Sequence, residues 1–285
     1  MPVSKKVSAK TTPKKIQTSS VIDRIQSLSF DDEEGIKILL YGRSGTGKTT
    51  LWSTFPKPIL SIVCSGGNKT GELRSINTEE NRKNVKCVTL EDSSEIVELA
   101  SYLAGTDKYK TVVLDHATGL QDLVLKEVLG LDEIPAQKYW GLATQQQYGQ
   151  CTLQSKELMR LLLNLDKNVV MIAQERENNV DSDNGLLLPS VGAGLTPALA
   201  GWLNTAVDYI CNTFIRQQVI VKRVKTGKGK MEKITDVKTP TDNVEYCLRT
   251  GPSPVFTTKF RLPKGKELPT VLVDPSYEKI IELIN

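Results

Sequence analysis

The sequence predicts an α/β fold in which helices flank a mostly parallel sheet, with added antiparallel strands towards the C-terminus. From residue 36 onward, short apolar runs alternate with segments of helical periodicity, an order typical of parallel sheets covered on both faces. Several of these runs are apolar without interruption, as strands buried on both faces require. The expected strands cover residues 36–41, 58–63, 85–90, 110–115 and 168–173.

Helices are expected between these strands. Asp92, followed three residues later by Glu95, has the spacing of a capping box and should open a helix. The apolar face of that helix carries Ile96, Leu99, Ala100 and Leu103. A longer helical region over 138–165 is predicted to supply a second apolar stripe, formed by Leu153, Leu158, Leu161, Leu162 and Leu165.

The pattern changes after Pro189. Residues 191–194 are predicted as a glycine-rich turn, and a short helix is expected from about Thr196. Two β-prone segments follow, at 208–215 and 217–224, and we interpret them as added antiparallel strands. Residues 222–230 are basic and contain glycine, which indicates a hairpin tip, and a final helix is expected from about Ser276.

Bulk composition limits the class of protein. The chain of 285 residues is 39% hydrophobic and 25% charged, which is typical of a soluble globular protein with one dominant core. Residues 1–19 nearly lack large apolar side chains, so we expect a disordered basic tail ahead of a domain over 20–285. No apolar run approaches the roughly 20 residues that cross a bilayer, which favours a cytoplasmic location. Scattered cysteines and a single His argue against zinc or a disulfide framework.

Residues 42–49 match the phosphate-binding pattern G-x-x-x-x-G-K-[ST] in full, between an apolar strand and a segment able to begin a helix. Glycines allow the backbone to wrap phosphate oxygens, and the following helix presents its positive end. The pattern therefore predicts ATP or a related triphosphate, with Lys48 on the β- and γ-phosphates and the Thr49 hydroxyl on Mg²⁺. The expected nucleotide contacts are Gly42, Arg43, Ser44, Gly45, Thr46, Gly47, Lys48, Thr49 and Thr50.

Polar residues at the ends of two further strands complete the expected site. Asp115 ends the strand over 110–115, where ligands bind in open α/β sheets, and we predict it as the second Mg²⁺ residue. The alternative is that Asp115 only caps the next helix. Gln174 follows the strand over 168–173 and is a candidate to sense the γ-phosphate or orient water, with Glu175 less favoured. The alternative is that each is an ordinary polar residue at the end of a strand. His116 is interpreted as structural.

The segments ILLYGRSGTGKTTL, TVVLDH, VVMIAQER and PALAGWLNTAVDYI together resemble the phage-encoded RecA-like ATPases of the Sak-type single-strand annealing group, over about 36–262. The resemblance implies a RecA-like P-loop core that assembles on single-stranded DNA as a homo-oligomer, ring or filament, with ATP between subunits. It also implies a role in annealing or recombination, in the cytoplasm of the host cell if the protein is phage-encoded.

In such proteins a basic residue from the neighbouring subunit completes the site. Our candidates are Lys259 and Arg261, expected on one face of a strand, with Arg249 as a weaker one; the alternative is that these are solvated charges on an edge strand. The resemblance also places a catalytic Glu after the strand over 58–63, where this sequence has Cys64 and Ser65. We therefore expect weak ATPase activity, or assistance from another group such as Glu72.

Single-stranded DNA is expected to contact the basic tip of the C-terminal extension. The candidate residues are Lys222, Arg223, Lys225, Lys228 and Lys230, which can follow phosphates without reading sequence. Two other functions remain open. One is a nucleotide-dependent assembly or clamp module without annealing activity, and the other is a P-loop kinase, for which an Arg-rich lid between residues 120 and 190 is missing.

Overall fold

The computed structural model describes residues 35–64, 73–131, 143–181, 187–226, 233–262 and 265–285. The predicted tail over 1–19 lies outside these ranges. In chain order the elements are β1 (Lys37–Gly42), α1 (Lys48–Trp52), β2 (Ile59–Val63), η2 (Leu73–Ile76), α3 (Glu79–Asn84), β3 (Val85–Thr89), α4 (Glu95–Ala104), β4 (Thr111–Asp115), α5 (Ala117–Val128), α6 (Gln145–Leu163), β5 (Asn168–Asp181), β6 (Leu187–Ala193), α7 (Pro197–Ala206), β7 (Tyr209–Thr226), β8 (Lys233–Arg249), β9 (Val271–Val273) and α8 (Tyr277–Ile284).

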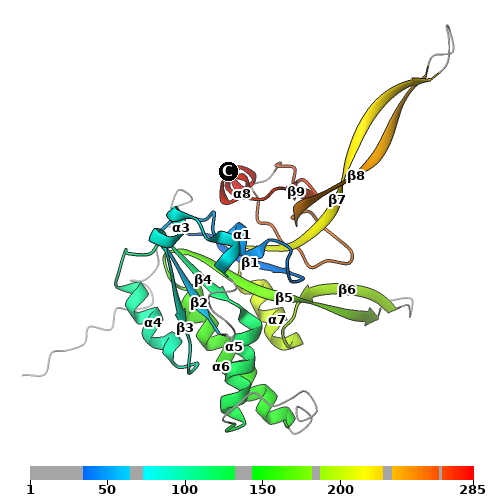
Figure 1. The fold of residues 1–285 in the computed structure, drawn as a ribbon. Coiled ribbons are helices and arrows are strands. Elements are labelled where there is room, and N and C mark those ends of the chain that lie inside the picture. Colours follow the sequence, from blue (N-terminus) through cyan, green and yellow to red (C-terminus); the bar gives the residue numbers. More distant parts are fainter. Residues whose placement is uncertain (1–34, 65–72, 132–142, 182–186, 227–232, 263–264) are drawn as a thin grey trace, which may run out of the picture. The chain divides into compact units, whose positions relative to one another are not determined.

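The strands form one sheet in the order β3-β2-β4-β5-β1-β7-β8-β9, with β6 paired to β5 (Figure 1). Strands β3 to β7 along this order are parallel, whereas β7 with β8 and β8 with β9 are antiparallel. The mostly parallel sheet with antiparallel C-terminal strands is thereby confirmed. Strand β5 lies between β1 and β4, so the chain segments that follow β1, β5 and β4 meet at one edge of the sheet.

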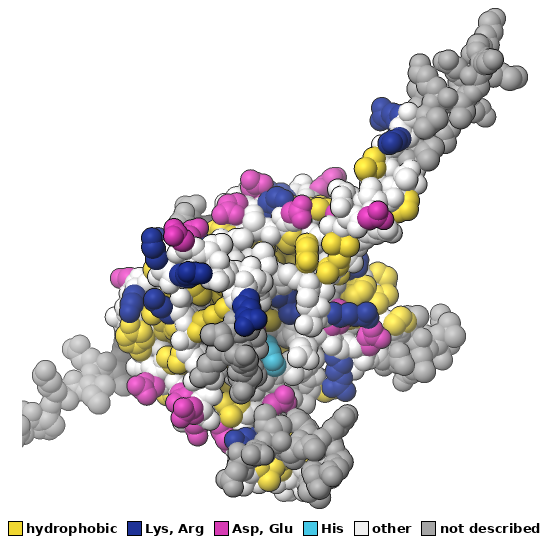
Figure 2. Space-filling view, viewed as in Figure 1, with side chains coloured by type: hydrophobic (Ala, Val, Ile, Leu, Met, Phe, Trp, Pro, Cys, Tyr) yellow, Lys and Arg dark blue, Asp and Glu magenta, His cyan; other side chains and the backbone are white. Residues whose placement is uncertain are grey.

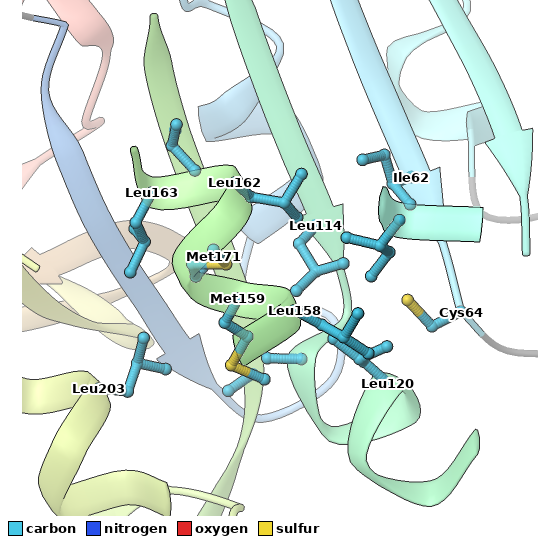
Figure 3. Packing of buried hydrophobic residues seen from close by; sticks show 14 of the residues in the cluster. Ile62, Cys64, Leu114, Leu120, Leu158, Met159, Leu162, Leu163, Met171 and Leu203 are labelled. Atoms are coloured by element: carbon cyan, nitrogen blue, oxygen red, sulfur yellow. The ribbon is translucent and has the colours of Figure 1, made fainter. Parts of the chain in front are cut away.

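Helices cover both faces of the sheet, and two apolar clusters fill the space beneath them. Alternate residues of β1 divide between the clusters, because successive side chains of a strand point to opposite faces. Leu39 and Tyr41 join the cluster under α4, α5, α6 and α7, whereas Ile38 and Leu40 join the one under α1, η2 and α8. Figure 3 shows Leu158 and Leu162 of the first cluster packed near Leu114.

The five core strands begin within one residue of the predicted positions, but β5 runs on to Asp181. This longer β5 pairs with β6 through the register Glu175↔Ala193 to Asp181↔Leu187. The predicted glycine-rich turn over 191–194 is therefore wrong, since Val191 to Ala193 belong to β6. Pairing with β5 supplies backbone hydrogen bonds that the local glycine content does not reveal.

The two β-prone segments after residue 208 form one strand, β7, with a register shift between Gln217 and Val219. Its first residues pair parallel to β1, from Ile38↔Tyr209 to Gly42↔Thr213, so the expected antiparallel arrangement is wrong for this part. The rest of β7 pairs antiparallel with β8. From Phe214 onward the described pairings of β7 are with β8 alone, and we call residues 214–226 and 233–246 the ribbon.

Two details of the predicted helices need correction. Helix α4 has Ser94 as its N-cap, and the Asp92 carboxylate accepts a hydrogen bond from the Ser94 N–H at 2.7 Å, so the predicted Asp92/Glu95 box does not form. In α6, Leu153 and Leu161 are 67% and 38% exposed. A helix buries one face only, and Leu158 and Leu162, one turn apart, occupy it. Among the described helices, none is long and apolar enough to cross a membrane.

Candidate nucleotide-binding site

The loop between β1 and α1 has the backbone shape that its glycines permit. Gly47 has φ 86° and directly precedes α1, a left-handed conformation that L side chains rarely adopt. At Gly42 a Cβ atom would lie 2.3 Å from the Thr213 hydroxyl oxygen and 2.4 Å from the Thr213 carbonyl oxygen. Strand β7 therefore requires glycine at position 42, because it passes against the start of the loop.

Side chains of the loop fix its shape from within. The Thr46 hydroxyl donates to the Arg43 carbonyl oxygen at 2.8 Å and lies 2.7 Å from the Thr213 hydroxyl of β7. The Lys48 ammonium donates to the carbonyl oxygens of Gly42 and Arg43, each at 2.7 Å. Lys48 thus lies folded over the loop. Burial lowers the pKa of Lys48, and the charges of Asp115 and Glu175 oppose this shift.

Asp115 ends β4 beside the loop. The helix after β4 is capped by the next residue, because the His116 Nδ1 accepts a hydrogen bond from the Gly119 N–H at 2.8 Å. Burial, and then the charge of Lys48, lower the pKa of His116, in keeping with this neutral structural role. The alternative that Asp115 itself caps α5 is therefore wrong. Asp115 lines a cavity of about 360 Å³ together with Lys48 and Thr49.

The donor set of this cavity fits Mg²⁺. Mg²⁺ prefers oxygen ligands and keeps several of its waters, so it uses only one or two protein carboxylates. Thr49 offers a hydroxyl and Asp115 a carboxylate to the same cavity. An ion held there would also offset the acidic charge that Asp115 and Glu175 place near a triphosphate.

A second cavity of about 430 Å³ adjoins the loop where β5 ends its pairing with β1. The parallel register Gly42↔Gln174 brings the chain after Ala173 level with the loop. Gln174 and Glu175 line this cavity with Lys48 and Asp115. Gln174 is exposed, whereas the Glu175 side chain is only 11% exposed.

Glu175 is held on two sides, which its sequence position does not suggest. One carboxylate oxygen accepts from the Arg43 Nε at 3.1 Å, and the other accepts from the Asn212 amide at 3.0 Å. Arg43 also contacts Glu177, at 3.0 Å, but Glu177 is 68% exposed and does not line the cavity. Glu175 is thus the more confined carboxylate. Only the parallel pairing of β1 with both β5 and β7 brings these residues together.

Lys259 and Arg261 lie away from the loop of their own chain. The Lys259 ammonium donates to two carbonyl oxygens at the C-terminal end of α7, those of Asn204 and Val207. Arg261 pairs with Asp208 at 2.6 Å. The Asp208 N–H bonds to the Lys37 carbonyl oxygen, at the start of β1, whereas the loop follows the end of β1. The expected strand here is also wrong, since the segment makes only isolated bridges, such as Ile210↔Lys259.

The surroundings of Arg249 and Cys64 indicate structural roles for both residues. The Arg249 guanidinium lies between the rings of Phe214 and Phe256, 4.6 and 4.1 Å from their centroids. Cys64 follows β2, and burial raises its pKa to about 12, so it is a neutral thiol and supplies no base. Ser65 and Glu72 lie outside the described residues.

The expected DNA contacts lie on the ribbon. Lys222 and Arg223 are exposed on β7, and Figure 2 shows Lys and Arg side chains on this part of the surface. Lys225 lies in β7 as well, paired with Ile234. Lys228 and Lys230 lie outside the described residues.

Comparison with known proteins identifies a family. A family model described as an AAA domain matches residues 34–262. No protein of curated function matches the sequence. Among solved structures, the chain is similar to the flagellar accessory protein FlaH from Methanocaldococcus jannaschii, with a TM-score of 0.39 and 10% identity, over 87% of this chain and 92% of that one.

Proposed function

The chain belongs to the AAA-domain family of P-loop ATPases, a nucleotide-binding family, and from this premise we propose that it binds ATP with Mg²⁺. In this proposal the protein hydrolyses the ATP weakly. It assembles on single-stranded DNA and supports annealing or recombination. The observation that carries the proposal is the loop, with Lys48 folded over it and Thr49 and Asp115 lining one cavity. Backbone N–H groups of such a loop bind phosphate oxygens, and the two oxygen donors suit the metal that accompanies a triphosphate.

Weak hydrolysis is supported by the resemblance and by the carboxylates of the site. The resemblance implies a catalytic Glu after β2, where this chain has Cys64, and burial keeps the Cys64 thiol protonated at neutral pH. Two carboxylates line the β5 cavity together with Lys48: Asp115, which is assigned to Mg²⁺, and Glu175. When it is released from Arg43, it can accept a proton from the attacking water, with Gln174 beside it to orient that water.

Assembly on DNA is supported by the resemblance and by the ribbon. The ribbon carries exposed cations at Lys222 and Arg223, which suit a phosphate backbone. In a head-to-tail oligomer, Lys259 or Arg261 of a neighbouring copy would face the ATP of this copy. Arg261 would then exchange its pairing with Asp208 for the triphosphate, and this exchange would couple assembly to nucleotide.

One experiment separates this proposal from its two alternatives: ATP turnover and oligomeric state are measured with and without single-stranded DNA. Assembly and turnover that depend on DNA support the proposal. ATP-dependent assembly that is indifferent to DNA would instead identify a clamp module. Acceptor-dependent ADP release without assembly would identify a kinase.

A further inference from the structure

Three cavities lie in a row along the loop. The first, of about 430 Å³, and the second, of about 360 Å³, share Ser44, Lys48 and Asp115. The second and a third, of about 310 Å³, share Gly47, Thr50 and Tyr246. The first and third have no lining residue in common, so the second lies between them.

The position of Lys48 indicates which end of this row of cavities would hold the γ-phosphate. In a P-loop the Lys reaches the β- and γ-phosphates, while the loop N–H groups hold the α- and β-phosphates. Lys48 lines the first two cavities and is absent from the third, so the γ-phosphate end lies on the side of Gln174 and Glu175. The ribose and base of a bound nucleotide must then leave the loop past Thr50, towards the third cavity.

The third cavity has the character of a base site. Its lining includes the apolar surfaces of Leu51 and Pro275 and the ring of Tyr246. Ligand sites are concave and mostly apolar with a few polar groups, and their volumes start at about 300 Å³. A purine needs less than that, so a base and part of a ribose fit.

Tyr246 comes from the ribbon and lies on the loop. A Cβ atom on Gly47 would meet the Tyr246 ring at 3.1 Å, so the ring touches the backbone that holds the phosphates. Tyr246 is nevertheless 43% exposed. Its backbone is held by the Asp274 N–H, which donates to the Tyr246 carbonyl oxygen at 2.8 Å. Folding therefore leaves Tyr246 partly exposed beside the cavity.

We propose that Tyr246 is the residue on which the base of the bound nucleotide stacks. The inference rests on the proposed nucleotide binding and names its base subsite. Aromatic rings stack on bases through their π faces, and a purine offers a larger face than a pyrimidine. Purine triphosphates are thus the preferred class of ligand, and the ribbon contributes directly to their affinity.

The test measures the binding of Mg²⁺-ATP and of Mg²⁺-tripolyphosphate, which lacks a base, by titration calorimetry. Tyr246→Ala should weaken ATP binding by about 5- to 150-fold, the range of base–aromatic stacking, and leave tripolyphosphate binding unchanged. Tyr246→Phe should bind ATP as the unaltered protein does. Tyr102→Ala serves as the matched control, because Tyr102 is 48% exposed on α4.

The outcomes separate the base site from nucleotide binding itself. If Lys48→Ala weakens ATP binding while Tyr246→Ala does not change it, the base site is wrong and nucleotide binding stands. If Tyr246→Ala weakens tripolyphosphate as much as ATP, the residue supports the loop and not a base. If the unaltered protein binds no triphosphate, the proposed function and the base site both fail.

The preference for a purine base can also be measured on the unaltered protein, where the result does not depend on how a variant folds. Because the purine face is larger, Mg²⁺-ATP should bind more tightly than Mg²⁺-UTP, and Tyr246→Leu should reduce this preference. Equal affinities for ATP and UTP in the unaltered protein would overturn the proposal.

Discussion

The parallel core and the ribbon use apolar residues in opposite ways. In the core, Leu39, Leu114 and Val170 are 0% exposed, so folding accounts for them. In the ribbon, Val221 and Val244 are 52% and 56% exposed although they lie in regular paired strands. Only a large contiguous patch of such apolar side chains indicates a surface for contact with other molecules. The core therefore holds the loop over 42–49, while the ribbon leaves apolar side chains in solvent.

Part of the apolar surface of the ribbon lies on the side of the nucleotide site. Ile215 pairs with Tyr246, and Gln217 pairs with Val244, so these side chains share one face of the two strands. Tyr246 on that face touches the loop at Gly47. A molecule that covered this face would therefore also lie next to the loop at Gly47.

The largest expected effect concerns the free energy of unfolding, which we compare between a core variant and a ribbon variant. Leu114→Ala removes a fully buried side chain of β4 and should lower the free energy of unfolding by about 2–5 kcal/mol. Val221→Ala on the ribbon should change it by less than about 0.5 kcal/mol. Urea unfolding of both variants measures the difference. A loss at Val221 as large as that at Leu114 would show that the ribbon is part of the folding core.

The next effect concerns catalysis by Glu175, in the cavity where β5 ends its pairing with β1. Glu175→Gln keeps the size of the side chain but removes its basicity, and ATP turnover should fall by about 100-fold or more if Glu175 accepts the proton from water. Glu177→Gln is the matched control, since Glu177 contacts Arg43 too but is 68% exposed and lies outside the cavity. A phosphate-release assay compares the two. Equal turnover in both variants would remove Glu175 from the mechanism.

Lys48→Ala should weaken Mg²⁺-ATP binding by about 10- to 150-fold, because a hydrogen bond to a charged group contributes about 1.5–3 kcal/mol. Calorimetric titration gives the affinity, and thermal unfolding checks that the fold is kept. Lys86→Ala, at an exposed position of β3, controls for the loss of one positive charge. If both variants bind ATP as the unaltered protein does, the loop does not hold the phosphates.

The smallest effect concerns DNA and the ribbon. Replacing Lys222 and Arg223 with Ser should flatten the slope of log affinity against log salt by about 1.4, since each contact on a single strand contributes about 0.7. ATP turnover without DNA should not change. The control replaces Lys83 and Lys86, which are exposed beside the opposite edge strand β3. A salt slope that falls equally in both pairs would show that DNA responds to total charge and not to the ribbon.

Local patterns in the sequence were sufficient for the core and the loop. Continuous apolar runs located β1 to β4 within one residue, because strands buried on both faces leave no polar interruption. The motif over 42–49 located the loop, because its glycines and Lys48 act through their own backbone and side chains. The Asp115 site followed from a general rule for parallel sheets.

Features that depend on distant pairing were not predictable in this way. β7 joins β1 in parallel and then continues into the ribbon, a change of partner that its β-prone residues do not encode. Tyr246 meets Gly47 only because β8 follows β7 back towards the loop. Likewise, Leu153 fits a leucine stripe by composition, but its angular position on α6 leaves it in solvent.

The contact between β7 and the loop has a mechanical consequence for the ribbon. The Thr213 hydroxyl of β7 lies 2.7 Å from the Thr46 hydroxyl of the loop, and β7 continues from there to Thr226, with a register shift between Gln217 and Val219. That length of strand is about 40 Å at roughly 3.3 Å per residue. A rotation of about 5° at Thr213 would therefore displace the far end by about 3.5 Å. If the ribbon rotated as a rigid body about this contact, a small adjustment of the loop would move its far end by several ångströms.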